Sequence, residues 1–370
     1  MASWKALSPT LSRVAAAWIV VGVGCSGGVD GSTSLSDDTA SVGDGWLDDT
    51  VGNDVSGDGA ANDVSGDGAA NDASTDGANQ DAAQGAETTG AGGTLALKDL
   101  AYTPPQGVNS DKATLDLFRV DDGQERPLVL LVHGGSWASG DKAGFAAKIV
   151  PWWLERGYVA APVNFRLASK KGQSPVVKPR DQTQDIAAAL AWLMKHADKY
   201  KIAKTGVVLM GYSSGAHLVA LLGTDETILQ AAGVDETQVA AAISLDVHAY
   251  DVPYALELMV GSVVAKNIPI IRHLFGTTEA EQLQGSPIHF VGGWAAKALV
   301  ISVDKDPKVQ GTHGYIVAKA AQRYVDALVK AGHTAKTLHD INETHSSLVG
   351  GYGAPGDPTT AAVKEFIEGL

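Results

Sequence analysis

The sequence predicts an α/β fold with a mostly parallel central sheet and helices on both faces. Apolar runs of strand length occupy residues 127–132, 158–164, 207–210, 239–245 and 298–303, and helical patterns separate most of them. Continuous apolar runs of this length are typical of strands buried on both sides. Because strands alternate with helices, the strands should be parallel and ligands should bind beyond their carboxyl ends.

The first 25 residues have the pattern of an export signal. Lys5 and Arg13 precede a short apolar run at residues 14–21, and small residues lead to Cys25, the only cysteine. This run is too short to cross a bilayer as a helix. Because a cysteine stands at the expected cleavage point, the segment resembles a bacterial lipoprotein signal. We expect lipidation of Cys25 and export to the cell envelope; the alternative is an ordinary signal peptide and a secreted protein.

Residues 26–93 form an acidic segment of Gly, Ala, Asp, Ser and Asn. They hold 14 Asp or Glu and no Lys or Arg, and a nine-residue repeat starts at Asn53, at Asn62 and, degenerately, at Asn71. Such a composition cannot bury enough apolar surface to form a core, so a disordered tether is expected. Calcium binding by the aspartates is the alternative. The rest of the chain is close to neutral, which gives no indication of a nucleic-acid partner.

The folded domain is expected at residues 94–370. Its first predicted strand covers residues 113–120, and a short strand is predicted at residues 335–339. Helices are predicted at residues 142–156, 181–196, 319–331 and 360–367.

The alternation lapses between residues 250 and 294, where residues 256–271 are apolar and could be helical. We expect a small lid or pocket wall there; a surface excursion without a role is the alternative. Trp137 and Tyr212 are candidate pocket residues.

The sequence around Ser213 carries the strongest chemical signal. Residues 211–215 read G-Y-S-S-G, directly after the apolar run at residues 207–210 and before an apolar helical pattern. In this strand–turn–helix context the two glycines leave room for a tight turn that exposes the serine hydroxyl. Ser213 is therefore the candidate nucleophile.

A serine hydroxyl needs a base to remove its proton. Among ten histidines, His345 is best placed, because it lies in a short loop after the predicted strand at residues 335–339. His339 should lie within that strand and His217 on the helix behind the serine, so both are expected to be packing or surface residues.

The base in turn needs an acid that orients it. Asp306 is the first candidate, because it follows the predicted strand at residues 298–303 and precedes a proline. Asp304 is one step closer to the strand and is the rival, and Asp246 and Asp340 come after these two.

The glycine pair after residues 127–132 is the candidate oxyanion hole. Gly134 and Gly135 let backbone N–H groups turn toward the site, so the expected surroundings of the oxyanion are Gly134, Gly135, Ser136 and Ser214.

From about residue 113 to the C-terminus the sequence resembles the α/β-hydrolase superfamily, in its esterase and lipase-like branch. That branch includes carboxylesterases, feruloyl esterase-like enzymes and kynurenine formamidases. The motifs that carry the resemblance are HGGSW at 133–137, NFRL at 164–167, GYSSGAHL at 211–218, SP at 286–287, DKDP at 304–307 and His345. Two features depart from the pattern: the loop reads HGGS rather than HGGG, and ISVDKDP lacks the usual glycine before the acid.

The resemblance implies an α/β-hydrolase fold with a small lid insertion and a serine hydrolase that cleaves carboxylic esters through an acyl-enzyme. It implies Ser213 as nucleophile, Asp306 as acid and His345 as base, an order along the chain that α/β-hydrolases use. No cofactor or metal is expected, and the expected partner is a small-molecule ester. One alternative is an arylformamidase or peptidase that cleaves an amide; another is an inert surface binding protein. The acyl and alcohol groups of the substrate and the oligomeric state stay open.

Overall fold

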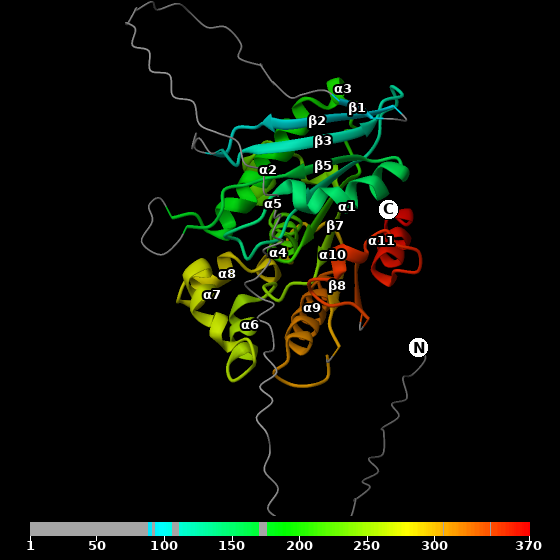
Figure 1. Cartoon of the computed structure of the whole chain (residues 1–370). Coiled ribbons are helices and arrows are strands. Elements are labelled where there is room, and N and C mark those ends of the chain that lie inside the picture. Colours follow the sequence, from blue (N-terminus) through cyan, green and yellow to red (C-terminus); the bar gives the residue numbers. More distant parts are fainter. Residues whose placement is uncertain (1–87, 91–92, 106–110, 170–175, 306, 341) are drawn as a thin grey trace, which may run out of the picture. The chain divides into compact units, whose positions relative to one another are not determined.

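The computed structural model describes residues 88–90, 93–105, 111–169, 176–305, 307–340 and 342–370 (Figure 1). The predicted export signal, with Cys25, and nearly all of the predicted tether lie outside the described residues, so both stay predictions. Within the described part of the chain, no helix is long and apolar enough to cross a membrane.

A nine-stranded sheet forms the centre of the domain, in the order β1-β2-β3-β5-β4-β6-β7-β8-β9. The pairs β1–β2, β2–β3 and β3–β5 are antiparallel. All the remaining pairs, from β5–β4 to β8–β9, are parallel, as predicted for most of the sheet. The bounds are β1 Thr88–Gly90, β2 Thr94–Ala101, β3 Thr114–Val120, β4 Leu128–Val132, β5 Val159–Val163, β6 Val207–Tyr212, β7 Val239–Leu245, β8 Lys297–Val303 and β9 Ala335–Asp340.

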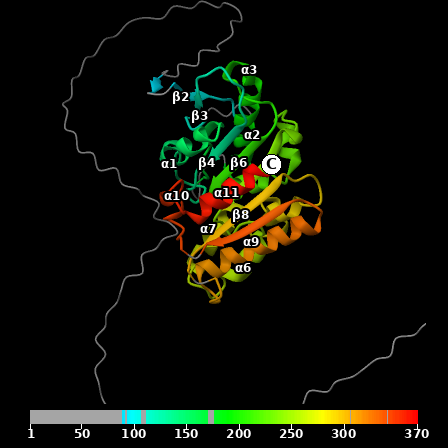
Figure 2. The same ribbon diagram turned by 90° about the vertical axis from the view of Figure 1, so that its right-hand side faces the viewer.

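Helices cover both faces of the sheet (Figures 1 and 2). Side chains of β4 show why: Leu128 and Leu130 pack in one apolar core, and Val129 and Leu131 pack in the other. Since successive strand residues point to opposite faces, a run of five buried residues requires a layer on each side. The helices α2 Pro179–Lys195, α4 Ser214–Leu222 and α9 His313–Lys330 supply the first core, and α1 Lys142–Glu155 and α11 Pro358–Glu368 the second.

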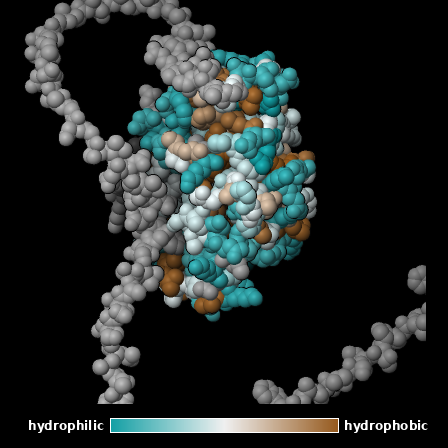
Figure 3. Space-filling model, turned by 45° about the vertical axis from the view of Figure 1, so that its right-hand side comes forward, coloured by the Kyte–Doolittle hydropathy of each residue, from teal (hydrophilic) through white to brown (hydrophobic). Residues whose placement is uncertain are grey.

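Short helices complete the fold: α3 Ala197–Tyr200, α5 Glu226–Ala231, η2 Glu236–Gln238 and α10 Leu348–Gly351. On the side shown in Figure 3, hydrophobic residues form small patches among hydrophilic ones.

The segment at residues 250–294, called the insertion below, is helical but broken. It contains α6 Val252–Met259, η3 Ala265–Asn267, α7 Ile268–Phe275, α8 Glu279–Gln284 and η4 Pro287–Phe290. The prediction of a helix over residues 256–271 is wrong in its continuity. Val260 leaves the helical conformation, and Gly261 has φ 72°. Pro269 lies in the first turn of α7, where the N–H that proline lacks would have had no acceptor within the helix.

The turn between β6 and α4 depends on glycines that approach backbone closely. A Cβ on Gly215 would lie 2.3 Å from the carbonyl oxygen of Val132 and 2.5 Å from that of His133. A Cβ on Gly211 would lie 2.2 Å from the carbonyl oxygen of Gly215. Any side chain at these positions would therefore push α4 away from the ends of β4 and β6.

The substitution Gly215→Ala is expected to lower the free energy of unfolding by about 1–3 kcal/mol or more, because the strands cannot move aside without breaking the sheet. Gly144→Ala is the matched control: it lies on the exposed side of α1 with open space around its Cβ position, so it should raise stability by about 0.5–1 kcal/mol. Urea unfolding of the two variants measures both effects. Equal stability of Gly215→Ala and the unmodified protein would refute this account of the turn.

Candidate active site

Ser213 occupies a sharp turn between β6 and α4. Its backbone has φ 53° and ψ −123°, a conformation that side-chain-bearing residues rarely adopt. The Ser213 N–H donates to the carbonyl oxygen of Leu245 at 2.8 Å, which fixes the turn against the end of β7. The predicted strand–turn–helix context of this serine is therefore confirmed.

His345 reaches Ser213 from the loop between β9 and α10. Its Nε2 lies 3.1 Å from Ser213 Oγ, so the sequence prediction that these two side chains meet is confirmed. Tyr212 fixes the loop: its hydroxyl donates to the carbonyl oxygen of His345 at 2.7 Å, and the two rings lie 5.0 Å apart. The main chain at His345 is thereby held over the nucleophile turn.

Asp246 is the carboxylate that orients His345. Its Oδ2 lies 2.6 Å from His345 Nδ1, and its Oδ1 accepts a hydrogen bond from the Val303 N–H at 2.9 Å. Burial alone would raise the pKa of Asp246. The hydrogen bond with His345 and the charges of His345 and His313 outweigh it, so the pKa of this carboxyl lies below its usual value. Asp246 is therefore ionised and holds the Nδ1–H of His345.

The prediction of Asp306 as the orienting acid is corrected by this hydrogen bond. Asp306 itself lies outside the described residues. Its rival Asp304 instead contacts another imidazole, with its Oδ2 3.1 Å from His313 Nδ1, and that hydrogen bond lowers the pKa of Asp304. The ends of β7 and β8 are adjacent at one edge of the sheet, so an acid after either strand can reach His345. The sequence order of strands does not decide between them.

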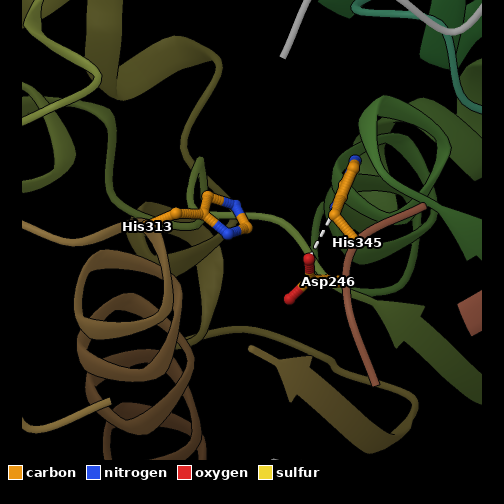
Figure 4. Close-up of side chains that lie close together, drawn as sticks. All are labelled: Asp246, His313 and His345. Carbon is orange, nitrogen blue, oxygen red and sulfur yellow. Dashed lines mark hydrogen bonds and ion pairs between the residues drawn. The ribbon is translucent and has the colours of Figure 1, made fainter. Parts of the chain in front are cut away.

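Asp246, His313 and His345 form one cluster of groups that could ligate a metal ion (Figure 4). Their ligand atoms lie within 4.8 Å of one another, and the two imidazoles approach the carboxylate from different elements. A tetrahedral zinc site needs ligand atoms about 3.4 Å apart, as follows from Zn–N bonds of about 2.1 Å. An ion held here would also compete with Ser213 for His345. The geometry suits an imidazole–carboxylate pair more closely than a resident metal.

The loop after β4 lies directly against the nucleophile turn. A Cβ on Gly134 would lie 3.0 Å from Ser213 Cβ, and Gly135, Ser136 and Trp137 all have positive φ. Three consecutive residues with positive φ make the main chain of this loop bend sharply beside Ser213. Ser136 and Ser214 line the pocket next to Ser213, where the sequence predicts the oxyanion hole.

His133 braces this loop. Its Nδ1 donates to the carbonyl oxygen of Gly134 at 2.7 Å, and its ring stacks on Phe165 at 4.5 Å.

A small pocket of about 30 Å³ opens beside Ser213 and His345. Trp137 lines it, as predicted, and its ring is fixed by a hydrogen bond from Nε1 to His217 Nδ1 at 3.2 Å. Tyr212 was predicted to line it too, but its side chain packs in the core under α1 and braces His345 instead. Strand alternation explains the difference, because Tyr212 points to the face opposite the pocket.

The insertion forms one wall of this pocket. Asn267, Ile270 and Ile271 line it together with Val247. The expectation of a pocket wall at residues 250–294 is therefore confirmed.

Three fully buried histidines near the site are neutral. Burial lowers the pKa of His133 and His217 to about 4 and that of His248 to about 3. His217 is satisfied in this state, because its Nε2 donates to the carbonyl oxygen of Gly285 at 2.7 Å while its Nδ1 accepts from Trp137.

These histidines predict acid sensitivity in a defined range. In the unfolded chain they bind protons below pH about 6.5, whereas in the native state they stay neutral until pH about 4. The contribution of these neutral histidines to the free energy of unfolding is thus fully present above pH about 6.5 and is lost as the pH falls toward 4. Urea unfolding between about pH 7.5 and about pH 5 tests this, and His217→Gln should weaken the dependence. A free energy of unfolding that is constant over this range would contradict it.

The family model described as BD-FAE matches residues 115–320 of the chain, more than half of its length. The chain belongs to the BD-FAE family. Among curated relatives of this BD-FAE protein, esterase LipQ of Mycobacterium tuberculosis is 24% identical over 274 residues, which cover 71% of this chain and 61% of LipQ. Kynurenine formamidase of Danio rerio is 25% identical over 268 residues, 69% of this chain and 76% of that protein. The chain thus spans less than two thirds of the length of LipQ.

Solved structures identify the fold of this BD-FAE protein. Esterase B from Lactobacillus rhamnosis superposes with a TM-score of 0.59 at 19% identity, over 75% of this chain and 86% of that one. The predicted α/β-hydrolase fold is confirmed.

Proposed function

We propose that this protein is a serine hydrolase that cleaves carboxylic esters through an acyl-enzyme. The observation that carries the proposal is the continuous line of hydrogen bonds from Asp246 through His345 to Ser213, with lengths of 2.6 and 3.1 Å. Nucleophile, base and orienting acid stand in this geometry in serine hydrolases of unrelated folds.

Each residue has a defined task in the proposed reaction. Ser213 Oγ attacks the ester carbonyl carbon and its proton passes to His345 Nε2. Asp246 stabilises the imidazolium through the Nδ1–H. The N–H groups of the loop after β4 and of Ser214 stabilise the oxyanion. His345 then protonates the leaving alcohol, and a water molecule activated by the same imidazole releases the acid.

The pocket favours a short acyl group. The enclosed space beside Ser213 is only about 30 Å³, and Asn267 and Ile271 of the insertion form part of its wall, so a small acyl group fits it best. The names of relatives agree with ester cleavage, since they include an esterase, a carboxylic ester hydrolase and methylesterases. Kynurenine formamidase is among the relatives too, which makes amide cleavage by the same three residues the second candidate.

Two measurements on the full chain test the proposal. A fluorophosphonate probe should label the protein, and peptide mass spectrometry should place the adduct on Ser213. Hydrolysis of p-nitrophenyl acetate should exceed that of N-formylkynurenine and of peptide anilides. Absence of labelling would favour an inert binding protein, and preferential cleavage of N-formylkynurenine would favour the formamidase.

A further inference from the structure

The wall of the pocket contains a buried amide, that of Asn267. The residue is only 4% exposed, and it lines the pocket together with Ser213 and His345. Neither its Oδ1 nor its Nδ2 has a hydrogen-bond partner among the residues that the structure describes. Buried amides in native proteins almost always have partners, so an exception requires an explanation.

Local structure does not supply one. Asn267 is the N-cap residue of α7, a position at which asparagine ordinarily accepts a hydrogen bond from an N–H of the first turn. Here the side chain makes no such bond, and the backbone has φ −85° and ψ −10° rather than the extended conformation of a capping residue. Pro269 in the first turn has no N–H to be capped. The amide is therefore not needed by the helix that it precedes.

Four apolar residues line the pocket together with this amide. Ile270, Ile271, Val247 and Trp137 line the same pocket, so Asn267 is a polar group set in a hydrophobic wall. An unpaired buried amide destabilises the free protein, because it loses its hydrogen bonds to water without replacement. Binding sites commonly have this composition: apolar walls with a few polar groups that fix the orientation of the ligand.

We propose that Asn267 determines substrate specificity by hydrogen-bonding a hydroxyl on the ester. The amide offers one acceptor, Oδ1, and the donor group Nδ2, and a hydroxyl both donates and accepts, so one hydroxyl can engage it either way. The preferred substrates are then short esters with a hydroxyl group near the scissile bond. The inference rests on the proposed esterase function and names the substrate class for the same site.

Pairs of esters that differ only by hydroxyl against methyl test this. Methyl 3-hydroxypropionate is compared with methyl butyrate, which places the hydroxyl on the acyl side. 2-Hydroxyethyl acetate is compared with propyl acetate, which places it on the alcohol side. In one of the two pairs kcat/KM should favour the hydroxylated ester by about 10- to 100-fold, because the apolar analogue leaves the amide unpaired. The pair that shows the preference identifies which half of the ester reaches Asn267.

The variant Asn267→Leu replaces the amide by an apolar group of similar size. The preference for the hydroxylated ester should fall to about 3-fold or less. Ile270→Leu is the matched control in the same wall, and its hydroxyl preference should stay that of the unmodified protein. Asn267→Leu should also raise the midpoint of thermal unfolding, because an unpaired buried amide is removed.

The outcomes separate this inference from the proposed function. Equal kcat/KM within both ester pairs, in a protein that a fluorophosphonate labels at Ser213, would overturn the role of Asn267 alone. A lower thermal midpoint of Asn267→Leu would overturn it too, because it would show that the amide is satisfied within the protein. Absence of labelling would instead overturn the esterase function.

Discussion

Replacement of Ser213 by alanine is expected to lower kcat for p-nitrophenyl acetate by on the order of 10³- to 10⁶-fold and to abolish labelling by a fluorophosphonate. The reason is that attack, proton transfer and acyl-enzyme formation all need the Ser213 hydroxyl, which lies 3.1 Å from His345 Nε2. Residual turnover would come from the oxyanion donors and from binding alone.

The neighbouring Ser214 is the matched control for this experiment. It is also buried beside the pocket, but only its main-chain N–H has a part in the proposed reaction. Ser214→Ala should keep the probe label, and circular dichroism should show that both variants are folded. Retention of the label in Ser213→Ala together with its loss in Ser214→Ala would assign the nucleophile to the other serine.

Replacement of Asp246 by asparagine is expected to lower kcat/KM by about 10⁴-fold. An asparagine amide can donate to His345 Nδ1 where the carboxylate accepts from it, so the imidazole would take the tautomer in which Nε2 carries the proton. His345 could then no longer accept the proton of Ser213. The Asp246 side chain is completely buried and lies 2.6 Å from His345 Nδ1. A water molecule therefore cannot replace the carboxylate as the acceptor of the Nδ1–H.

Asp304→Asn and Asp306→Asn are the matched controls, since both residues follow the adjacent strand β8. Asp304 contacts His313 rather than His345, so its variant should lower kcat/KM by less than about 10-fold. A loss of activity in Asp306→Asn that exceeds the loss in Asp246→Asn would restore the acid that the sequence favours. Steady-state kinetics on one ester at one pH decides between the three carboxylates.

The candidate nucleophile and base could be predicted because each depends on local sequence. A Cβ on Gly211 or Gly215 would lie only 2.2 or 2.3 Å from a main-chain carbonyl oxygen, so both positions require glycine. This requirement is visible in the sequence as G-x-S-x-G after an apolar run. His345 follows a short strand, and parallel strands bring their carboxyl ends to one edge of the sheet.

Strand β2 and the broken helices of the insertion were not predicted. The burial pattern of β2 mixes buried, partly buried and exposed residues around a bulge near Asp99, so its apolar period is lost. In the insertion, the conformations at Val260 and Gly261 end one helix, and apolar periodicity alone does not reveal such breaks.

The sequence by itself determined the α/β architecture, the serine and the histidine, because buried strands, glycine turns and motif spacing are properties of neighbouring residues. Only the tertiary structure decided which carboxylate orients His345 and that Asn267 faces the pocket. Asp246 and Asp304 directly follow adjacent parallel strands, and packing across the sheet decides that Asp246 contacts His345 whereas Asp304 contacts His313. Contacts between residues 99 positions apart are set by the whole fold and leave no mark in local sequence.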